Sequence, residues 1–186
     1  KLMQNFLFNF FVTISTISGQ AAMITASAIV SALVFFYHKE KRLAGFIFFN
    51  YMATMTIVVL LKNIIEQPRS PLALVYENSY AFPSGHTASA MVTLLILFYL
   101  SQFIKNNFWK RFTQVFAVAW LISIISARIY LQVHDFYDIA GGIIVASIVF
   151  YFSLKIRIFR KGILKEEFVK AEKTLKKEEE VLINKI

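Results

Sequence analysis

Five segments of this sequence contain no Asp, Glu, Lys or Arg, and each has about the length that a bilayer core demands. They are Gln20–Tyr37, Leu43–Leu61, His86–Ile104, Phe112–Ala127 and Ile139–Leu154. A helix crosses the hydrocarbon core with roughly 17–25 apolar residues, and the two shorter segments reach that length with their flanking residues. Lipid offers no hydrogen bonds to the backbone, so such segments must be helical. The sequence therefore predicts an all-α, polytopic membrane bundle with five spans.

Positive charge is gathered on one side of this predicted bundle. A net charge of +9 would by itself also fit a nucleic-acid-binding protein. However, the basic residues follow the first, third and fifth spans, namely Lys39, Lys41, Arg42, Lys105, Lys110, Arg111, Lys155, Arg157, Arg160, Lys161 and Lys165. Connections rich in Lys and Arg lie on the cytoplasmic side of a membrane. We therefore expect no nucleic-acid partner and a location in a bacterial inner (cytoplasmic) membrane, with the loops around residues 62–85 and 128–138 facing the periplasmic, extracytoplasmic side.

The two ends of the chain carry helical patterns outside the spans. In residues 2–18, Phe6, Phe10 and Ile14 recur at helical spacing among polar residues, which predicts a helix lying in the outer interface. The highly charged residues 165–186 predict a cytoplasmic amphipathic helix. We thus expect a membrane-embedded domain over residues 1–164 and a charged tail over 165–186. Because residue 1 is Lys rather than Met, we expect the chain to be part of a longer one, and the sequence does not decide whether a further spanning helix precedes it.

Nearly all ionisable residues on the outward side belong to three short motifs. The motifs are KNIIEQPRSP with Lys62 and Arg69, Pro-Ser-Gly-His at residues 83–86, and ARIYLQVHDFYD with Arg128, His134 and Asp138. Lys and Arg supply cationic donors, and the planar fork of Arg matches two phosphoryl oxygens at once. Ser84 is a predicted N-cap ahead of free helix N–H groups, and Gly85 lets a ligand approach that backbone. Together these residues predict a phosphate-binding cradle.

Two histidines beside the cradle add chemistry that binding alone does not need. Asp138 follows His134 by four residues, so its carboxylate can hold one ring nitrogen and leave the other free to attack phosphorus. His86 has no such partner nearby in the sequence, and we assign it to protonate the leaving oxygen and then activate water. We interpret Glu77 and Asp135 as solvated loop residues, with tuning of the field in the pocket as the alternative.

The outward carboxylates do not form a metal-binding pattern. A two-metal site needs carboxylates and histidines that converge on ions about 3.5–4 Å apart. The carboxylates available here are dispersed among cations; they are Glu66, Glu77, Asp135 and Asp138. We therefore predict no metal ion and no cofactor.

The order Lys-x6-Arg, Pro-Ser-Gly-His and Arg-x5-His-x3-Asp resembles the tripartite signature of the type 2 phosphatidic acid phosphatase superfamily, over residues 20–155. This resemblance implies a metal-independent phosphatase that works through a phosphohistidine on His134. It also implies roles for the other motif residues, with phosphate bound by Lys62, Arg69, Ser84, Gly85 and Arg128, proton transfer by His86 and orientation by Asp138. Two positions depart from the family pattern, which usually has Arg-Pro where this chain has Arg69–Ser70–Pro71 and Ser-Arg where it has Ala127–Arg128.

The expected function is that of an integral membrane lipid phosphatase acting on a terminal phosphate monoester or diphosphate at the outer leaflet. The candidate substrates are lipids of the undecaprenyl diphosphate or phosphatidylglycerol phosphate type, and the aromatic residues Tyr76, Tyr80, Phe82 and Tyr137 are candidates for the pocket wall. Alternatives are a lipid A phosphatase, a lipid phosphotransferase using the same site, and a non-enzymatic lipid transporter. Transporter sites lie near the bilayer midplane, whereas these polar residues gather at the ends of spans. We expect the lipid bilayer and the lipid substrate as partners, and no obligate protein partner.

Overall fold

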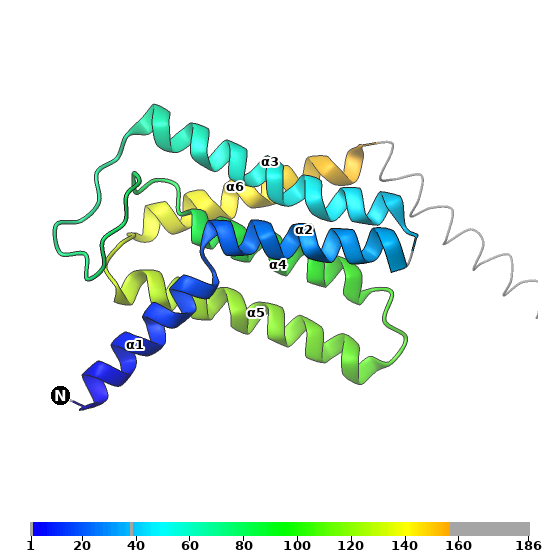
Figure 1. The fold of residues 1–186 in the computed structure, drawn as a ribbon, viewed down its shortest axis with the longest axis horizontal. Coiled ribbons are helices and arrows are strands. Elements are labelled where there is room, and N and C mark those ends of the chain that lie inside the picture. The colour runs from blue at the N-terminus through cyan, green and yellow to red at the C-terminus, as the bar shows by residue number, and fades with distance from the viewer. Residues whose placement is uncertain (1, 38, 157–186) are drawn as a thin grey trace, which may run out of the picture.

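The chain folds into a bundle of helices. In the computed structural model, residues 2–37 and 39–156 are described, and they form six α helices and no strand. The helices are α1 (Leu2–Ile17), α2 (Gln20–Tyr37), α3 (Lys41–Ile65), α4 (Gly85–Ser101), α5 (Asn107–Tyr130) and α6 (Phe136–Lys155) (Figure 1). The predicted all-α class is therefore confirmed. The predicted tail helix over 165–186 lies outside the described residues.

Four helices are long and apolar enough to cross a membrane, namely α2, α3, α5 and α6. The remaining predicted span, His86–Ile104, corresponds to α4, an apolar helix of 17 residues that ends at Ser101. The described residues therefore contain four candidate spans and one shorter apolar helix in place of five equivalent spans. The helix expected over residues 2–18 is present as α1, while its position in the membrane interface stays a prediction.

The helix ends follow the capping chemistry of the sequence. The carboxylate of Asp135 accepts a hydrogen bond from the N–H of Asp138 at 2.9 Å and caps α6, so this residue is exposed and outside the helix, as predicted, and has a capping role as well. Asn106 caps α5 in the same way. Helix α3 continues to Ile65, which places Lys62 in its last turn and not in the loop. Charged residues end a hydrophobic segment in the sequence without ending the helix.

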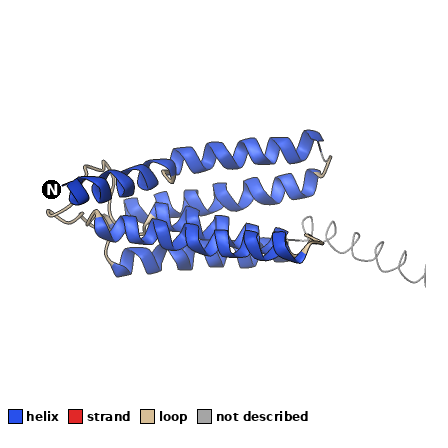
Figure 2. Cartoon of the chain, turned by 90° about the horizontal axis from the view of Figure 1, so that it is seen from below, coloured by secondary structure: helices blue, strands red, loops and turns tan. Residues whose placement is uncertain are grey.

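Helix α4 is the centre of the bundle and packs against α3, α5 and α6, while α2 packs on α3 and α1 on α5. Figures 1 and 2 show α2 to α6 running side by side along one direction. Phe46, Tyr51, Val92 and Phe150 belong to the main buried cluster, which joins α3, α4 and α6. Gly142 of α6 approaches α4 so closely that an added Cβ would lie 2.5 Å from the carbonyl oxygen of Ser84. Glycine at this position therefore lets the two helices come into close contact.

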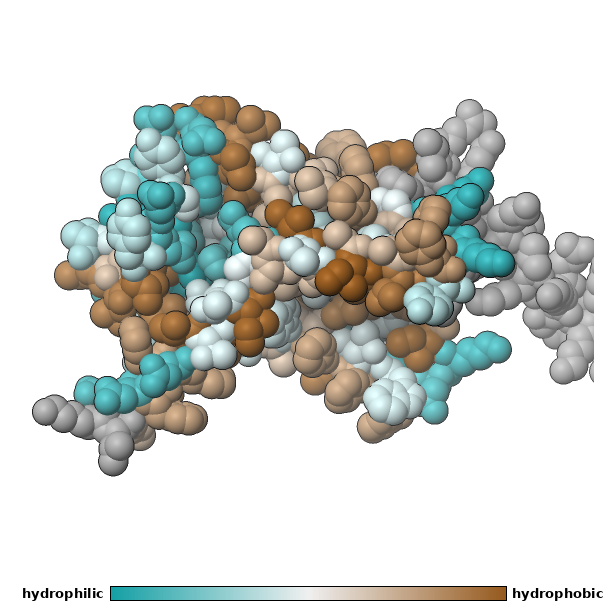
Figure 3. Space-filling model, in the orientation of Figure 1, coloured by the Kyte–Doolittle hydropathy of each residue, from teal (hydrophilic) through white to brown (hydrophobic). Residues whose placement is uncertain are grey.

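The outer surface of the bundle is apolar along its middle. Large side chains such as Ile64, Phe112 and Phe152 are more than half exposed. Figure 3 shows hydrophobic residues in a band between two hydrophilic ends. A surface of this kind is stable in lipid and not in water, which agrees with an integral membrane protein. The loop of residues 66–84 and the α5–α6 connection lie at one end, and the α2–α3 and α4–α5 connections lie at the other (Figure 1).

Candidate active site

The three sequence motifs meet at one end of the bundle. Arg69 lies in the loop after α3, His86 in the first turn of α4, and His134 in the connection between α5 and α6. Nη1 of Arg69 is 3.4 Å from Nε2 of His134. Single ligand atoms of Glu77, His86 and His134 all lie within 4.8 Å of one another. Residues that are far apart in the sequence therefore surround one small space.

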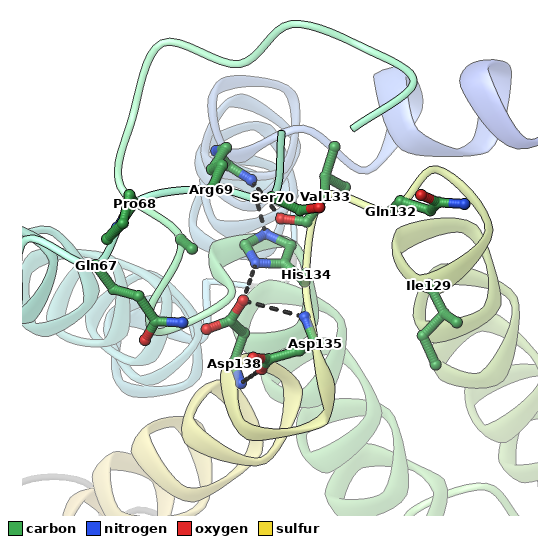
Figure 4. A pocket seen from close by; sticks show the side chains of 11 residues that line it. Gln67, Pro68, Arg69, Ser70, Ile129, Gln132, Val133, His134, Asp135 and Asp138 are labelled. Atoms are coloured by element: carbon green, nitrogen blue, oxygen red, sulfur yellow. Dashed lines mark hydrogen bonds and ion pairs between the residues drawn. The ribbon is translucent and has the colours of Figure 1, made fainter. Parts of the chain in front are cut away.

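His134 is held in one orientation by Asp138. The ring Nδ1 lies 3.0 Å from Oδ2 of Asp138, and the same carboxylate oxygen accepts a hydrogen bond from the N–H of Asp135 at 3.2 Å. Figure 4 shows the ring of His134 between Asp138 on one side and Arg69 on the other. Because a carboxylate only accepts hydrogen bonds, Nδ1 carries the proton. Nε2 therefore keeps its lone pair and points toward the arginine.

The surroundings of His134 also favour the neutral ring. Burial lowers the pKa of His134 to about 4; the hydrogen bond to Asp138 opposes this shift, and the positive charges of Arg128 and Arg69 add to it. The ring is therefore neutral at neutral pH, with a free lone pair on Nε2, as a nucleophile must be.

Two predicted phosphate ligands, Arg69 and Arg128, are joined by a carboxylate that the sequence analysis did not assign to the site. Nη2 of Arg69 is 2.8 Å from Oε2 of Glu77, and Nη2 of Arg128 donates a hydrogen bond to Oε1. Burial disfavours the Glu77 anion, but Arg128, His86 and Arg69 outweigh that effect and lower the pKa of Glu77. Burial likewise lowers the pKa of Arg69, against the opposing charge of Glu77. The interpretation of Glu77 as a solvated loop residue was therefore wrong.

Arg128 is fully buried and has a second hydrogen-bond partner in the N-terminal helix. Its Nη1 donates a hydrogen bond to the hydroxyl of Ser15 in α1. Ser15 carried no signal in the sequence, because it lies 113 residues before its partner. His86 lines the same hollow as Ser15 and Glu77, so α1 contributes to the walls of the site.

Lys62 and the Pro-Ser-Gly-His motif form hydrogen bonds with the backbone around the site. Nζ of Lys62 donates hydrogen bonds to the carbonyl oxygens of Tyr80 and Ala81. Ser84 is the N-cap of α4, as predicted; its Oγ accepts a hydrogen bond from Thr87 Oγ1 at 3.0 Å, and its N–H donates to the carbonyl of Asp138 at 2.9 Å.

The space beside Gly85 is filled by a neighbouring side chain. A Cβ added at Gly85 would overlap the amide of Gln20, the first residue of α2. Glycine at this position therefore allows a close approach to the backbone, and in this structure the approaching group is the Gln20 amide.

Three hollows open around the charged cluster. One, of about 440 Å³, is lined by Arg69, His134 and Asp138 (Figure 4). A second, of about 530 Å³, is lined by Lys62, Arg69 and Glu77. The third, of about 240 Å³, is lined by Ser15, Glu77 and His86. Arg69 and Glu77 each border two of these hollows and thus separate them. Of the predicted wall residues, Tyr80 lines the second hollow and Tyr76 the third.

Glu77, His86 and His134 are close enough to hold a metal ion by distance alone. However, both carboxylate oxygens of Glu77 bind guanidinium groups, and the neighbouring arginines repel a divalent cation. The positive charge of these arginines makes the site better suited to an anion than to a metal ion.

Comparisons with known proteins agree with this architecture. The sequence pattern described as PAP2 superfamily matches residues 43–161. Phosphatidylglycerophosphatase B of Bacillus subtilis (strain 168) is 28% identical over 156 residues, which cover 80% of this chain and 76% of that protein. A probable sphingosine-1-phosphate phosphatase of Dictyostelium discoideum is 29% identical over 123 residues, which cover 59% of this chain and 30% of that protein.

One solved structure shares the fold. It is the crystal structure of a transmembrane PAP2 type phosphatidylglycerolphosphate phosphatase from Bacillus subtilis, with a TM-score of 0.71 and 24% sequence identity. The similarity covers 80% of this chain and 75% of the other.

Proposed function

This chain belongs to the PAP2 superfamily and is a membrane phosphatase related to phosphatidylglycerophosphatase B, and from this premise we propose that it removes the terminal phosphate from a membrane lipid through a phosphohistidine on His134. The observation that carries the proposal is the hydrogen bond between Nδ1 of His134 and Asp138, which leaves Nε2 facing Arg69. A neutral ring with one free lone pair beside cationic donors is suited to attack phosphorus.

We assign the first step to His134 and His86. Nε2 of His134 forms a bond to phosphorus, and the bond from phosphorus to the ester oxygen breaks. The leaving oxygen takes a proton from His86, which enters this step in its protonated form and leaves it neutral, so the lipid departs as a neutral alcohol. The phosphorylated ring is cationic, and the carboxylate of Asp138 stabilises it. Arg69 and Arg128 neutralise the charge on the phosphoryl oxygens.

In the second step a water molecule attacks phosphorus and gives a proton to His86. The bond between phosphorus and Nε2 breaks, which releases inorganic phosphate and restores neutral His134. Lys62, Ser84 and Gly85 complete the phosphate-binding set in this proposal, with Ser84 and Gly85 at the positively polarised N-terminus of α4. The cycle needs no metal ion, because arginines and helix N–H groups neutralise the charge.

A lipid phosphate monoester with a small headgroup, of the phosphatidylglycerol phosphate type, is the preferred substrate in this proposal. The two curated relatives are both named for phosphate monoesters. We place the site on the extracytoplasmic side of a bacterial inner membrane, because the basic connections lie at the opposite end of the bundle. The acyl chains then stay in lipid while the headgroup enters the charged cluster.

The test is phosphate release by the purified protein in detergent from phosphatidylglycerol phosphate, undecaprenyl diphosphate and phosphorylated lipid A. We expect free phosphate from the phosphatidylglycerol phosphate and no loss of activity in EDTA. Complete loss on chelation would contradict the metal-independent mechanism. Release from none of the lipids would refute the function, and a phosphorylated acceptor lipid in place of free phosphate would indicate a transferase.

A further inference from the structure

We propose that Glu77 competes with the substrate phosphate for Arg69 and Arg128. Its carboxylate binds both arginines until a lipid phosphate displaces it. After hydrolysis the carboxylate binds the arginines again and thereby displaces the product phosphate. This inference rests on the proposed function, because it requires that the site binds a phosphoryl group. It goes further by assigning to one residue the control of substrate affinity and product release.

The first argument is that Glu77 makes the contacts expected of a bound phosphate. Its two carboxylate oxygens reach separate guanidinium groups, that of Arg69 at 2.8 Å and that of Arg128. A phosphoryl group bridging these arginines would use the same donors. The pKa of Glu77 lies below its usual range, so the residue is an anion at neutral pH and the resemblance extends to charge.

The second argument is that carboxylate and phosphate exclude each other. A carboxylate oxygen of Glu77 and single ring nitrogens of His86 and His134 lie within 4.8 Å of one another. A phosphorus atom ready for attack has to sit about 3–3.5 Å from the attacking nitrogen, and its leaving oxygen has to reach the other ring. That position overlaps the place of the carboxylate, and two anions there would also repel each other.

The third argument is that Glu77 has room to leave. Its side chain borders two hollows, one lined by Lys62 and Tyr80 and the other by Ser15 and His86. Hydrogen bonds fix the loop on both sides of Glu77. The N–H of Leu74 donates to the carbonyl of Leu131 at 2.9 Å, and Nε of Arg69 donates to the carbonyl of Ser79 at 2.7 Å. Residues 75–78 therefore form a short arch between two fixed points. Rotation of the Glu77 side chain into either hollow opens the site without moving the loop.

The two other roles open to this carboxylate predict different results. If Glu77 only holds the arginines in place, its removal weakens phosphate binding. If it transfers a proton, its removal lowers kcat and leaves KM unchanged. A competitor alone predicts that removal makes phosphate bind more tightly.

The experiment compares wild type, Glu77→Gln and Glu77→Asp in detergent, with inorganic phosphate as the probe. We expect Glu77→Gln to lower the inhibition constant of phosphate and the KM for the lipid by about tenfold or more, because a neutral amide competes poorly for two arginines. We expect kcat to fall where product release limits turnover, because no carboxylate then displaces the phosphate from the arginines. Glu77→Asp keeps the charge, so we expect its affinity for phosphate to stay closer to that of wild type than the affinity of Glu77→Gln does.

Thermal unfolding gives a second measurement that needs no turnover. Glu77→Gln leaves the buried Arg128 and the partly buried Arg69 without their anion, so in the absence of phosphate it should unfold at a lower temperature than wild type. Added phosphate should raise its melting temperature more than that of wild type, because the ligand replaces the lost carboxylate. Potassium chloride at equal ionic strength controls for screening.

Glu66→Gln is the matched control. Glu66 is an exposed residue of the same loop, at the C-cap of α3, and its substitution removes one negative charge without touching the arginines. We expect it to leave phosphate affinity unchanged.

The outcomes separate this inference from the proposed function. Unchanged or weaker phosphate binding in Glu77→Gln, or an equal gain in Glu66→Gln, would overturn the inference while wild-type hydrolysis still stood. A wild type that releases no phosphate from any lipid would refute the function. Tighter phosphate binding in Glu77→Gln would in that case still support competition for the anion site.

Discussion

The guanidinium of Arg128, fully buried at the end of α5, donates a hydrogen bond to the hydroxyl of Ser15 in α1. This contact links a motif residue of the phosphatase to a helix that lies outside the family match at residues 43–161. The other Nη of the same guanidinium binds Glu77. Helix α1 therefore helps to hold the guanidinium of Arg128 in one orientation.

The first prediction concerns this contact. Ser15→Ala should raise KM by about tenfold or more, because Arg128 loses a hydrogen bond that orients it, and such bonds to charged groups contribute about 1.5–3 kcal/mol. The measurement is steady-state hydrolysis of the lipid substrate. Thr13→Ala is the control on the same helix, since Thr13 is exposed and its hydroxyl donates a hydrogen bond to the carbonyl of Asn9 at 2.8 Å within α1. A fall in melting temperature with an unchanged KM would mean that Ser15 only holds α1 in place.

The second prediction concerns the nucleophile. His134→Asn should abolish both phosphate release and the alkali-stable, acid-labile phosphoenzyme, since no other described residue places a free ring nitrogen beside Arg69. The phosphoenzyme is measured with radiolabelled substrate quenched at alkaline pH. His86→Asn should slow both steps by about 10²–10⁴-fold, the usual contribution of a general acid or base. Normal phosphate release from His134→Asn would exclude it as the nucleophile.

The third prediction concerns protonation. The chain has three histidines, so ring-labelled protein gives three sets of nitrogen signals in a long-range proton–nitrogen NMR spectrum. His134 should keep the proton on Nδ1 and remain neutral as the pH falls through 6.5, gaining its second proton only near the pKa of about 4 that burial produces. In Asp138→Asn the preference for Nδ1 should weaken. Titration of all three rings near 6.5 would show that the site is not desolvated.

The location of the site could be predicted from the sequence because spans alternate in direction. Five uncharged segments place Arg69, His86 and His134 at the same end of the bundle, and the structure has them close together there. The pairing of His134 with Asp138 was also predictable, since residues four apart share one face where a helix begins.

The contacts of Glu77, Ser15 and Gln20 could not be predicted in this way. Glu77 lies in a loop without periodicity and meets Arg128 across 51 residues of sequence. Gln20 reaches Gly85 only because α2 packs beside α4. Such contacts depend on tertiary packing, which spacing in one sequence does not encode. The ends of α3 differ from those of the predicted span for a simpler reason. Lys41 and Lys62 lie in the helix, although their charge excluded them from the predicted span.

The last prediction tests whether the close approach of α6 to α4 holds the site together. In Gly142→Ala the new methyl group would lie 2.5 Å from the Ser84 carbonyl oxygen and 3.1 Å from the Ala88 nitrogen. The helices would have to separate, which strains the hydrogen bond from the Ser84 N–H to the Asp138 carbonyl. We expect a loss of about 1–3 kcal/mol in stability, as for other overpacked cores, together with lower activity.

Gly45→Ala is the matched control for this change, because Gly45 is an exposed residue of α3. Replacing an exposed helical glycine with alanine stabilises a helix by roughly 0.5–1 kcal/mol. The same substitution should therefore lower the melting temperature at position 142 and raise it at position 45, as measured by thermal unfolding in detergent. If Gly142→Ala kept the melting temperature and activity of wild type, the helices would have room to spare. The hydrogen bond between Ser84 and Asp138 would then not be what aligns the N-terminus of α4, the proposed phosphate site, with His134.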